Sequence, residues 1–337
     1  MPETPVMAPE SSEAAEALRR SSATSRITVV AGSIRRYGLL GAFAVLFLYL
    51  IIVSPAFRNT ANLLNLLQQN AIIGVVACGM LVMIISGGFD LSVGAVGATA
   101  SVLAARLSGD VPPIVVVVVA LGIGVVVGGV NGLLIAKLRI NPFVTTLGMA
   151  SVVSGLLFVA TNAQPIPLSG GTSTFNALGL GHVWRVPTDF LVFLACAGLI
   201  WALLRLTRFG HYVYAVGGNE QASLLSGIPI ARVKILAYVI GGVFSAVAGV
   251  ILLGQTDIGQ PSAAADWPLS AIAVCVVGGA SLAGGSGSIP ATILGTLLLG
   301  TVANGLNQLN VSPYWQPTVT GAVVLAAVGL AGLSRRK

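Results

Sequence analysis

Charged side chains are scarce in this chain of 337 residues, where they make up only 8% of the sequence. A soluble domain usually carries about 25% charged residues. Hydrophobic residues make up 55%, and the mean hydropathy is +0.95. One folded core cannot hide so much apolar surface from water, so the composition indicates an integral membrane protein. At about 20 residues per crossing, the length suits roughly eight to eleven membrane-spanning helices.

Residues that carry catalysis or bind metals are also few. The two histidines fall in predicted loops, and the three cysteines fall in separate apolar segments without the spacing of a metal site or a disulfide framework. The stretch GGSG at 284–287 fits the loose serine motif of intramembrane proteases, but no histidine follows His211 to act as its base. We therefore expect no catalytic residue and no metal site, and we do not expect an enzyme.

Lysine is rarer than arginine, and none of the three lysines follows a glycine, so the chain has no P-loop for ATP. Ion coupling would instead need ionisable groups within the helix bundle. Of the ten acidic residues, only Asp90 lies near the expected membrane depth. These absences favour a transporter whose energy comes from another polypeptide over one that is driven by an ion gradient.

Ten apolar segments follow a polar N-terminal tail, which we expect to be a disordered cytosolic segment over residues 1–33. Two of the segments are irregular, and they predict broken or short helices near 86–91 and 278–289. Residues 34–337 then form one all-α transmembrane domain with about ten helices and a cytosolic loop at 207–233. The ten segments lie at about 37–53, 62–86, 91–107, 112–136, 143–160, 189–206, 233–254, 268–280, 289–306 and 315–333.

The basic residues are distributed unevenly between the predicted loops. If the N-terminus is cytosolic, ten crossings place fourteen lysines and arginines inside and three outside, which is the positive-inside pattern. Both termini are then cytosolic, and the formal net charge of +7 reflects anchors spread over separate loops, not a nucleic-acid patch. The inside residues are Arg19, Arg20, Arg26, Arg35, Arg36, Lys137, Arg139, Arg205, Arg208, Arg232, Lys234, Arg335, Arg336 and Lys337, and the outside residues are Arg58, Arg106 and Arg185.

The stretch GGFDLSVG at 87–94 places Asp90 between two long apolar segments. A bare carboxylate costs about 2.5 kcal/mol or more at the bilayer centre, so its surroundings must compensate. We favour Asp90 as a cap for the free N–H groups of the following helix, with a gating ion pair and a direct solute contact as open alternatives. The residues of this predicted turn or gate are Gly87, Gly88, Asp90, Ser92 and Gly94.

A second glycine-rich stretch, GGASLAGG at 278–285, shares Gly, Gly, Leu and Gly in register with GGFDLSVG. Both stretches precede a segment that is predicted to run outward. The sequence leaves two interpretations open, an ancient internal duplication and a coincidence of glycine-rich composition.

The predicted cytosolic loop contains a short helix over EQASLLS. Asn219 can cap its N-terminus, Glu220 suits the helix dipole, and Gly227 ends it. A helix this short is marginal alone, so it needs a surface to pack against. Leu224 and Leu225 favour docking into a groove of a partner over a plain surface helix.

Four blocks of sequence carry a family resemblance. They are SGGFDLSVGAV (86–96), NGLLIAKLRINPFVTTLGM (131–149), TRFGHYVYAVGGNEQASLLSGIPIARVKILAYVIGG (207–242) and VVGGASLAGGSGSIPATILGTLLLG (276–300). In this order they resemble the permease subunit of bacterial ABC sugar importers of the ribose/xylose/galactose type. The resemblance covers about 37–333. It implies the ABC importer permease fold, a place in the bacterial inner membrane, and a monosaccharide as cargo.

The resemblance also implies partners. Family permeases pair as homodimers in membrane lipid, receive substrate from a periplasmic or lipid-anchored sugar-binding protein, and bind an ATPase subunit with two nucleotide-binding halves. ATP is then bound by that partner, and no cofactor is expected in this chain. The 217–229 loop would form the coupling helix, although Gln221 stands where the family pattern has an alanine. Its ATPase-coupling positions are Gly218, Asn219, Glu220, Ala222 and Gly227.

The cargo itself is not encoded by a motif. Related permeases for branched-chain amino acids or nucleosides are the alternative, and a stand-alone ion-coupled carrier is a third. Polar residues in apolar segments either line a translocation pathway or only bond to neighbouring helices. Asn141, followed by Pro142, can also simply start its helix. The pathway candidates are Gln68, Gln69, Asn70, Asn131, Asn141, Thr145 and Asn304.

Overall fold

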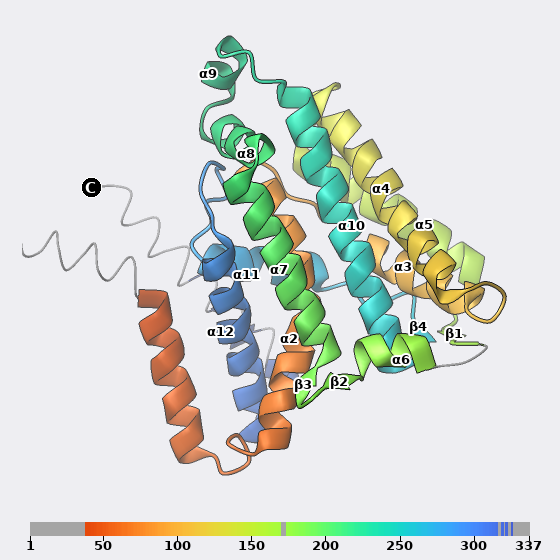
Figure 1. The fold of residues 1–337 in the computed structure, drawn as a ribbon, viewed down its shortest axis with the longest axis vertical. Coiled ribbons are helices and arrows are strands. Elements are labelled where there is room, and N and C mark those ends of the chain that lie inside the picture. Colours follow the sequence, from red (N-terminus) through yellow and green to blue (C-terminus); the bar gives the residue numbers. More distant parts are fainter. Residues whose placement is uncertain (1–37, 170–172, 316–317, 320, 323–324, 326–337) are drawn as a thin grey trace, which may run out of the picture.

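The computed structural model describes residues 38–169, 173–315, 318–319, 321–322 and 325. This part of the chain is a bundle of helices with short helices and strands at its ends (Figure 1). A helix at Gly38–Val53 precedes the labelled elements. The labelled helices are α2 (Thr60–Ile85), α3 (Val93–Leu107), α4 (Pro113–Ala136), α5 (Pro142–Thr161), α6 (Ser173–Gly179), α7 (Thr188–Leu206), α8 (Arg208–Gly218), α9 (Glu220–Leu225), α10 (Ile230–Thr256), α11 (Trp267–Val277), α12 (Ile289–Gln308) and the 3-10 turn η1 (Pro313–Trp315).

Six of the described helices, α2, α4, α5, α7, α10 and α12, are long and apolar enough to cross a membrane. Three shorter apolar helices, Gly38–Val53, α3 and α11, also coincide with predicted segments. The predicted tail at 1–33 lies outside the described residues, as does most of the tenth predicted segment at 315–333. The chain is thus a multi-helix membrane protein, while the predicted count of about ten crossings is not confirmed.

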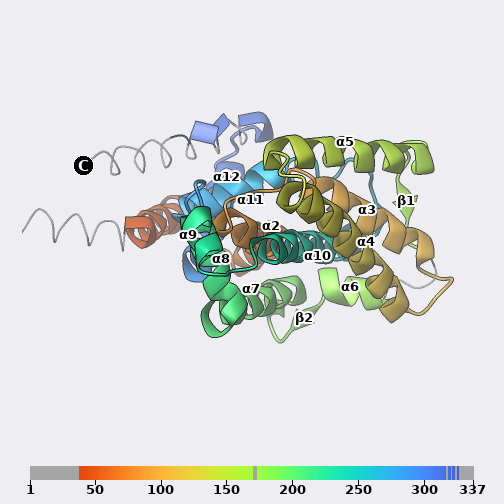
Figure 2. The ribbon, with the colours of Figure 1, turned by 90° about the horizontal axis from the view of Figure 1, so that it is seen from above.

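Helices α2 and α10 form the centre of the bundle. Seen from above in Figure 2, α10 lies between α7 on one side and α5 on the other. The buried share of the most apolar stretch of each helix shows this difference. It is 83% in α2 and 61% in α10, against 22% in α4 and 17% in α5. The outer helices therefore present apolar faces that fit the hydrocarbon of a bilayer. Glycine lets α4 approach α10, because a Cβ on Gly124 would collide with the backbone of Gly242.

The described fold also contains two small antiparallel sheets, so the all-α expectation needs a minor correction. β1 (Ile166–Pro167) pairs with β4 (Ile258–Gly259), and β2 (His182–Val183) pairs with β3 (Val186–Pro187). Each strand has two residues, which is too short for an alternating pattern to predict it. The pairs satisfy backbone groups where the chain leaves one helix and turns toward the next.

Both predicted helix breaks are present. α2 ends at Ile85 and α3 begins at Val93, whereas α11 ends at Val277 and α12 begins at Ile289. Gly87 has a φ of +89°, a conformation that glycine adopts at little cost. α11 has only 11 residues, and at about 1.5 Å per residue it cannot cross a hydrocarbon core of about 30 Å.

The predicted loop at 207–233 contains two helices, not one. The sequence predicted α9 but missed α8, which occupies residues 208–218. Thr207 caps α8, since its Oγ1 accepts a hydrogen bond from the N–H of Gly210 at 3.2 Å. The sequence did not predict this helix because it contains glycines at 210, 217 and 218, and glycine is a poor helix former.

Candidate functional site

Helix α9 projects from one end of the bundle, beyond α8 and the start of α10 (Figure 1). Asn219 caps it as predicted, because its Oδ1 accepts a hydrogen bond from the N–H of Ala222 at 2.9 Å. Gly227 follows the helix with a φ of +76°. The side chains of Leu224 and Leu225 are 63% and 89% exposed, so α9 presents an uncovered apolar tip. The role of this tip in docking an ATPase stays a prediction.

Glu220 forms an ion pair with Lys234, whose Nζ lies 2.6 Å from its Oε2. The pair joins the first residue of α9 to the first turns of α10. The sequence predicted only the favourable position of Glu220 at the helix N-terminus. Lys234 was missed as its partner because the two residues are 14 positions apart in different elements.

Asp90 is buried in the turn between α2 and α3, with 1% of its surface exposed. Its Oδ1 accepts hydrogen bonds from the backbone N–H and the Oγ of Ser92, both at 2.6 Å. Its Oδ2 accepts a hydrogen bond from Nδ2 of Asn131 on α4 at 3.2 Å, and the same Nδ2 also donates to Oγ of Ser92 at 2.9 Å. The carboxylate therefore joins the broken helix to α4.

This geometry corrects the predicted role of Asp90 as the cap of α3. The N-cap residue is Ser92, and Asp90 bonds to the N–H of that residue, not to the free N–H groups of the first helical turn. No side chain makes a capping hydrogen bond at the start of α3. Among the described residues Asp90 has no ion-pair partner, and its burial leaves no surface for a solute in this conformation.

The same turn is held by two residues that sequence analysis did not single out. Oη of Tyr238 on α10 donates a hydrogen bond to the carbonyl of Phe89 at 3.2 Å. Oγ1 of Thr146 on α5 accepts one from the N–H of Leu91 at 3.0 Å. A Cβ on Gly88 would collide with the hydroxyl of Tyr238, which explains a glycine at this position. The signal that was available is a tyrosine within an otherwise apolar span.

A Cβ on Gly94, the last glycine of the predicted turn, would collide with the carbonyl oxygen of Ala264. Ser92 is fully buried between Asp90 and Asn131. The predicted turn residues are therefore gathered in one place, although their role as a gate stays a prediction.

The pathway candidates are not gathered around one cavity. Asn70 donates to the carbonyl of Leu66 at 2.6 Å, and Asn141 caps α5 by accepting from the N–H of Phe143 at 2.8 Å. The side chain of Asn304 exchanges two hydrogen bonds with Asn62, both at 3.0 Å. These contacts favour the alternative in which polar side chains bond to their own or neighbouring helices.

Thr145 differs from the other candidates. It is 7% exposed, and its Oγ1 has no hydrogen-bond partner within the described part of the chain. Gln68 donates to the carbonyl of Gly179 at 2.8 Å, which joins α2 to α6. Contact of any of these residues with a transported solute stays a prediction.

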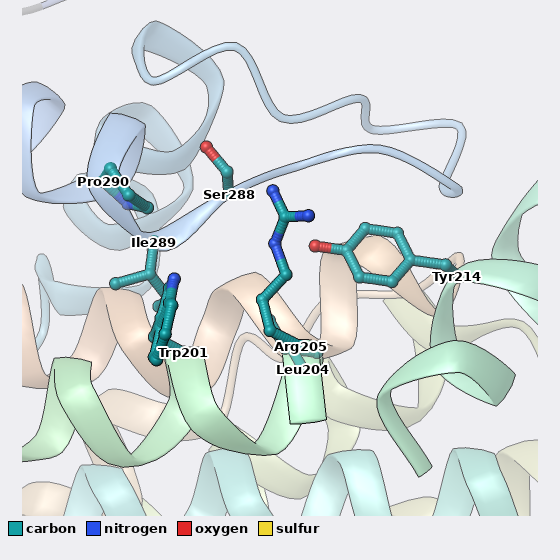
Figure 3. Close-up of a pocket in the computed structure, with 7 residues that line it drawn as sticks. All are labelled: Trp201, Leu204, Arg205, Tyr214, Ser288, Ile289 and Pro290. Carbon is teal, nitrogen blue, oxygen red and sulfur yellow. The ribbon is translucent and has the colours of Figure 1, made fainter. Parts of the chain in front are cut away.

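A cavity of about 90 Å³ lies between α7, α8 and the start of α12 (Figure 3). The side chain of Arg205 points between Ser288 and the hydroxyl of Tyr214. Ligand pockets usually measure about 300–1,000 Å³, so this cavity is too small for a sugar-sized substrate. Its lining residues are Trp201, Leu204, Arg205, Tyr214, Ser288, Ile289 and Pro290.

Within the described ranges, no group of three or more His, Cys, Asp and Glu residues could hold a metal ion. Cys78, Cys196 and Cys275 are free; the first and last are buried, and Cys196 is partly buried. These findings leave helix α9 and the turn at Asp90 as the two candidate sites.

Comparison with known proteins identifies the family. The model of the family described as "Branched-chain amino acid transport system / permease component" matches residues 62–328. The chain belongs to this permease family. The ribose import permease protein RbsC of Bacillus subtilis (strain 168) is 43% identical to this permease over 293 residues, which are 86% of this chain and 91% of that protein.

Two further relatives of this permease are named as L-arabinose permeases. The L-arabinose transport system permease protein AraH of Escherichia coli (strain K12) is 40% identical over 301 residues, 87% of this chain and 89% of that protein. The L-arabinose ABC transporter permease protein AraH of Azospirillum brasilense is 36% identical over 307 residues, 88% of this chain and 87% of that protein. The predicted resemblance to ABC sugar permeases is confirmed. No solved structure matches the chain.

Proposed function

We propose that this protein is the membrane permease subunit of an ATP-driven importer and that its cargo is a monosaccharide. The observation that carries the proposal is the identity of 40–43% to ribose and arabinose permeases over 86–87% of the chain. Those relatives support a pentose-sized sugar over the branched-chain amino acids that the family description names. The chain itself has no P-loop, so ATP is bound by a separate ATPase subunit.

Helix α9 is the docking point for that ATPase. It extends beyond the bundle, and its leucines at 224 and 225 are largely uncovered. An amphipathic helix whose apolar side chains lie in a groove is a common mode of recognition. The cap at Asn219 and the ion pair at Glu220 stabilise the first turn of this short helix.

The orientation follows from the distribution of cations between the two ends of the bundle. The α4–α5 connection, the α7–α8 junction and the start of α10 lie at the end that carries α9 (Figure 1). By the positive-inside rule this end faces the cytosol, and the same rule favours a cytosolic side for both termini. The cations at this end are Lys137, Arg139, Arg205, Arg208, Arg232 and Lys234, against Arg58, Arg106 and Arg185 toward the other.

Two copies of the permease form the translocation unit, and a sugar-binding protein delivers cargo to its outer face. A passage between two copies is consistent with the small size of the described cavity, about 90 Å³. The apolar outer faces of α4 and α5 suit either lipid or a second copy. Uphill movement then requires all three components, namely the permease pair, the ATPase and the binding protein.

The proposal is tested by uptake into proteoliposomes that contain the permease, its ATPase subunit and its binding protein. We expect ATP-dependent accumulation of labelled ribose or L-arabinose, and none when either partner is omitted. Labelled leucine serves as the control cargo. Accumulation of leucine in place of sugar would indicate that the protein is an amino-acid permease. Concentrative uptake by the permease alone would exclude an ATP-driven mechanism.

A further inference from the structure

Three glycine-rich segments that are distant in sequence meet at the end of α8. A Cβ on Gly217 would collide with the carbonyl oxygen of Ile85, the last residue of α2, and would lie 2.7 Å from the amide nitrogen of Gly285. A Cβ on Gly284 would lie 2.6 Å from the carbonyl oxygen of Gly217 and 3.0 Å from Cα of Gly87. The backbones of α8, the α2–α3 turn and the α11–α12 loop are therefore in direct contact.

These contacts are reinforced by two hydrogen bonds. The N–H of Gly285 donates to the carbonyl of Ile85 at 2.9 Å, and so satisfies a carbonyl at the end of α2 that has no partner within its helix. Oη of Tyr214 on α8 donates to the carbonyl of Gly287 at 2.8 Å. Figure 3 shows Tyr214 reaching toward the segment that leads into Ser288. The α11–α12 loop is thus bound both to α2 and to α8.

We define the glycine joint as Gly87, Gly217, Gly284 and Gly285. Three of its members, Gly87, Gly284 and Gly285, have φ values of +89°, +90° and +73°, which residues with a Cβ rarely adopt. The joint holds no side chain that could rotate to absorb a displacement. Close-packed protein interiors transmit strain, so a movement of one of these backbones must displace the other two.

Only two residues separate Gly217 of the joint from α9, the element that contacts the expected partner. α8 ends at Gly218, Asn219 follows, and α9 begins at Glu220. We propose that Gly217 is a positioning residue through which a displacement of α9 reaches both broken helices at once. On the α2–α3 side, the displacement reaches the turn that contains Asp90. The hydrogen bond from Asn131 to Asp90 joins this turn to α4. The inference rests on the proposed function, since it assumes that an ATPase moves α9.

The chain offers a matched pair of substitutions to test the joint. Gly217→Ala introduces a methyl group that meets backbone atoms, whereas a Cβ on Gly198 meets nothing within 4 Å. Gly217 lies in α8 and Gly198 in α7, so the two substitutions have a similar intrinsic effect on helix propensity, and Gly198 lies outside the coupling loop. The measurement is the amount of labelled sugar accumulated per ATP hydrolysed, in proteoliposomes with the ATPase and the binding protein.

For Gly217→Ala we expect at least a tenfold loss of sugar per ATP, with co-purification of the ATPase and basal hydrolysis within about twofold of the unmodified complex. Gly198→Ala should stay within about twofold in all three measurements. An unchanged ratio of sugar to ATP in Gly217→Ala, or an equal loss in both variants, would overturn the inference. A complex of unmodified proteins that shows no ATP-dependent uptake would instead contradict the proposed function.

A second variant keeps the test decisive if Gly217→Ala does not fold. Tyr214→Phe removes one hydroxyl group and adds no atom, so it breaks the bond to Gly287 while the packing stays intact. We expect sugar per ATP to fall two- to fivefold while ATPase binding is unchanged. A ratio equal to that of the unmodified complex would show that the link between α8 and the α11–α12 loop carries no displacement.

Discussion

The carboxylate of Asp90 accepts three hydrogen bonds from two residues and has no cationic partner in the described part of the structure. Burial of a carboxylate without such bonds would cost several kcal/mol. The bonds to Ser92 shape the turn, and the bond to Asn131 fixes that turn against α4. At this scale the residue stabilises one arrangement of the broken helix, and its contribution depends on its oxygens as acceptors.

This view predicts different outcomes for two substitutions of Asp90. Asp90→Asn keeps one oxygen for Ser92, and an amide flip of Asn131 can offer its Oδ1, which has no partner among the described residues. Asp90→Leu leaves buried donors of Ser92 and Asn131 unsatisfied, at a cost of about 1–3 kcal/mol each. We expect the Asn variant to keep its melting temperature in detergent to within a few degrees, and the Leu variant to be lost or strongly destabilised.

The control for these substitutions is Asp110→Leu, because Asp110 is exposed in the loop before α4. Such a surface change should alter stability by less than about 0.5 kcal/mol. A well-folded Asp90→Asn protein that has lost all sugar uptake would contradict the structural role and would indicate that the negative charge itself acts in transport.

Some of the residues that hold the two candidate sites could be predicted from the sequence, and others could not. Asp90 was conspicuous because it is a lone charge between apolar runs, and Asn219 because asparagine before a short helix is a cap signal. Lys234 carries no such local signal, and Tyr238 stands out only as a polar side chain in an apolar span. Neither signal identifies a partner, since Glu220 and Phe89 come from other elements. Tertiary packing decides which residues form hydrogen bonds between elements. This packing leaves no periodic pattern in the sequence.

Among the elements, α9 is the one whose stability depends most on its surroundings. It has six residues, far fewer than the roughly 12–15 that an isolated helix needs. The ion pair between Glu220 and Lys234 attaches its first turn to α10. Glu220 is about half exposed, so the pair is worth at most about 1 kcal/mol after screening by solvent. The helix is therefore positioned mainly by its cap and its flanking turns.

Charge reversal distinguishes an internal role of Glu220 from a direct contact with the partner. Glu220→Lys places two cations together and opposes the helix dipole, so we expect ATPase affinity to fall about two- to fivefold. The double variant Glu220→Lys/Lys234→Glu restores the pair but not the dipole, and should recover about half of the lost binding free energy. The measurement is a titration of purified permease with the ATPase. No recovery in the double variant would mean that Glu220 binds the partner directly.

The elements themselves were largely predictable, because long apolar runs and glycine-rich breaks have strong local signals. Nine predicted apolar segments correspond to described helices, and the breaks after α2 and α11 are where the glycines indicated. The arrangement of the helices was not predictable. The central place of α2 and α10, and the meeting of the two glycine-rich stretches at α8, depend on contacts across more than 60 residues of sequence.

At the scale of the whole molecule, the proposed orientation places α9 and the β2–β3 hairpin on opposite sides of the membrane. Leu225 on α9 is 89% exposed and Trp184 in the hairpin is 99% exposed, so both positions can take a cysteine at little structural cost. The native Cys78 and Cys275 are buried, which keeps background labelling low. The unmodified permease, which retains the partly buried Cys196, sets the baseline.

We expect a membrane-impermeant maleimide to label Leu225→Cys only in inverted vesicles and Trp184→Cys only in right-side-out vesicles. Added ATPase should block labelling of Leu225→Cys, since docking covers the tip of α9, and should leave Trp184→Cys unaffected. Labelling of both positions from the same side would contradict the positive-inside orientation. If bound ATPase does not change the labelling of Leu225→Cys, the orientation would still hold. That result would show that α9 is not the docking element.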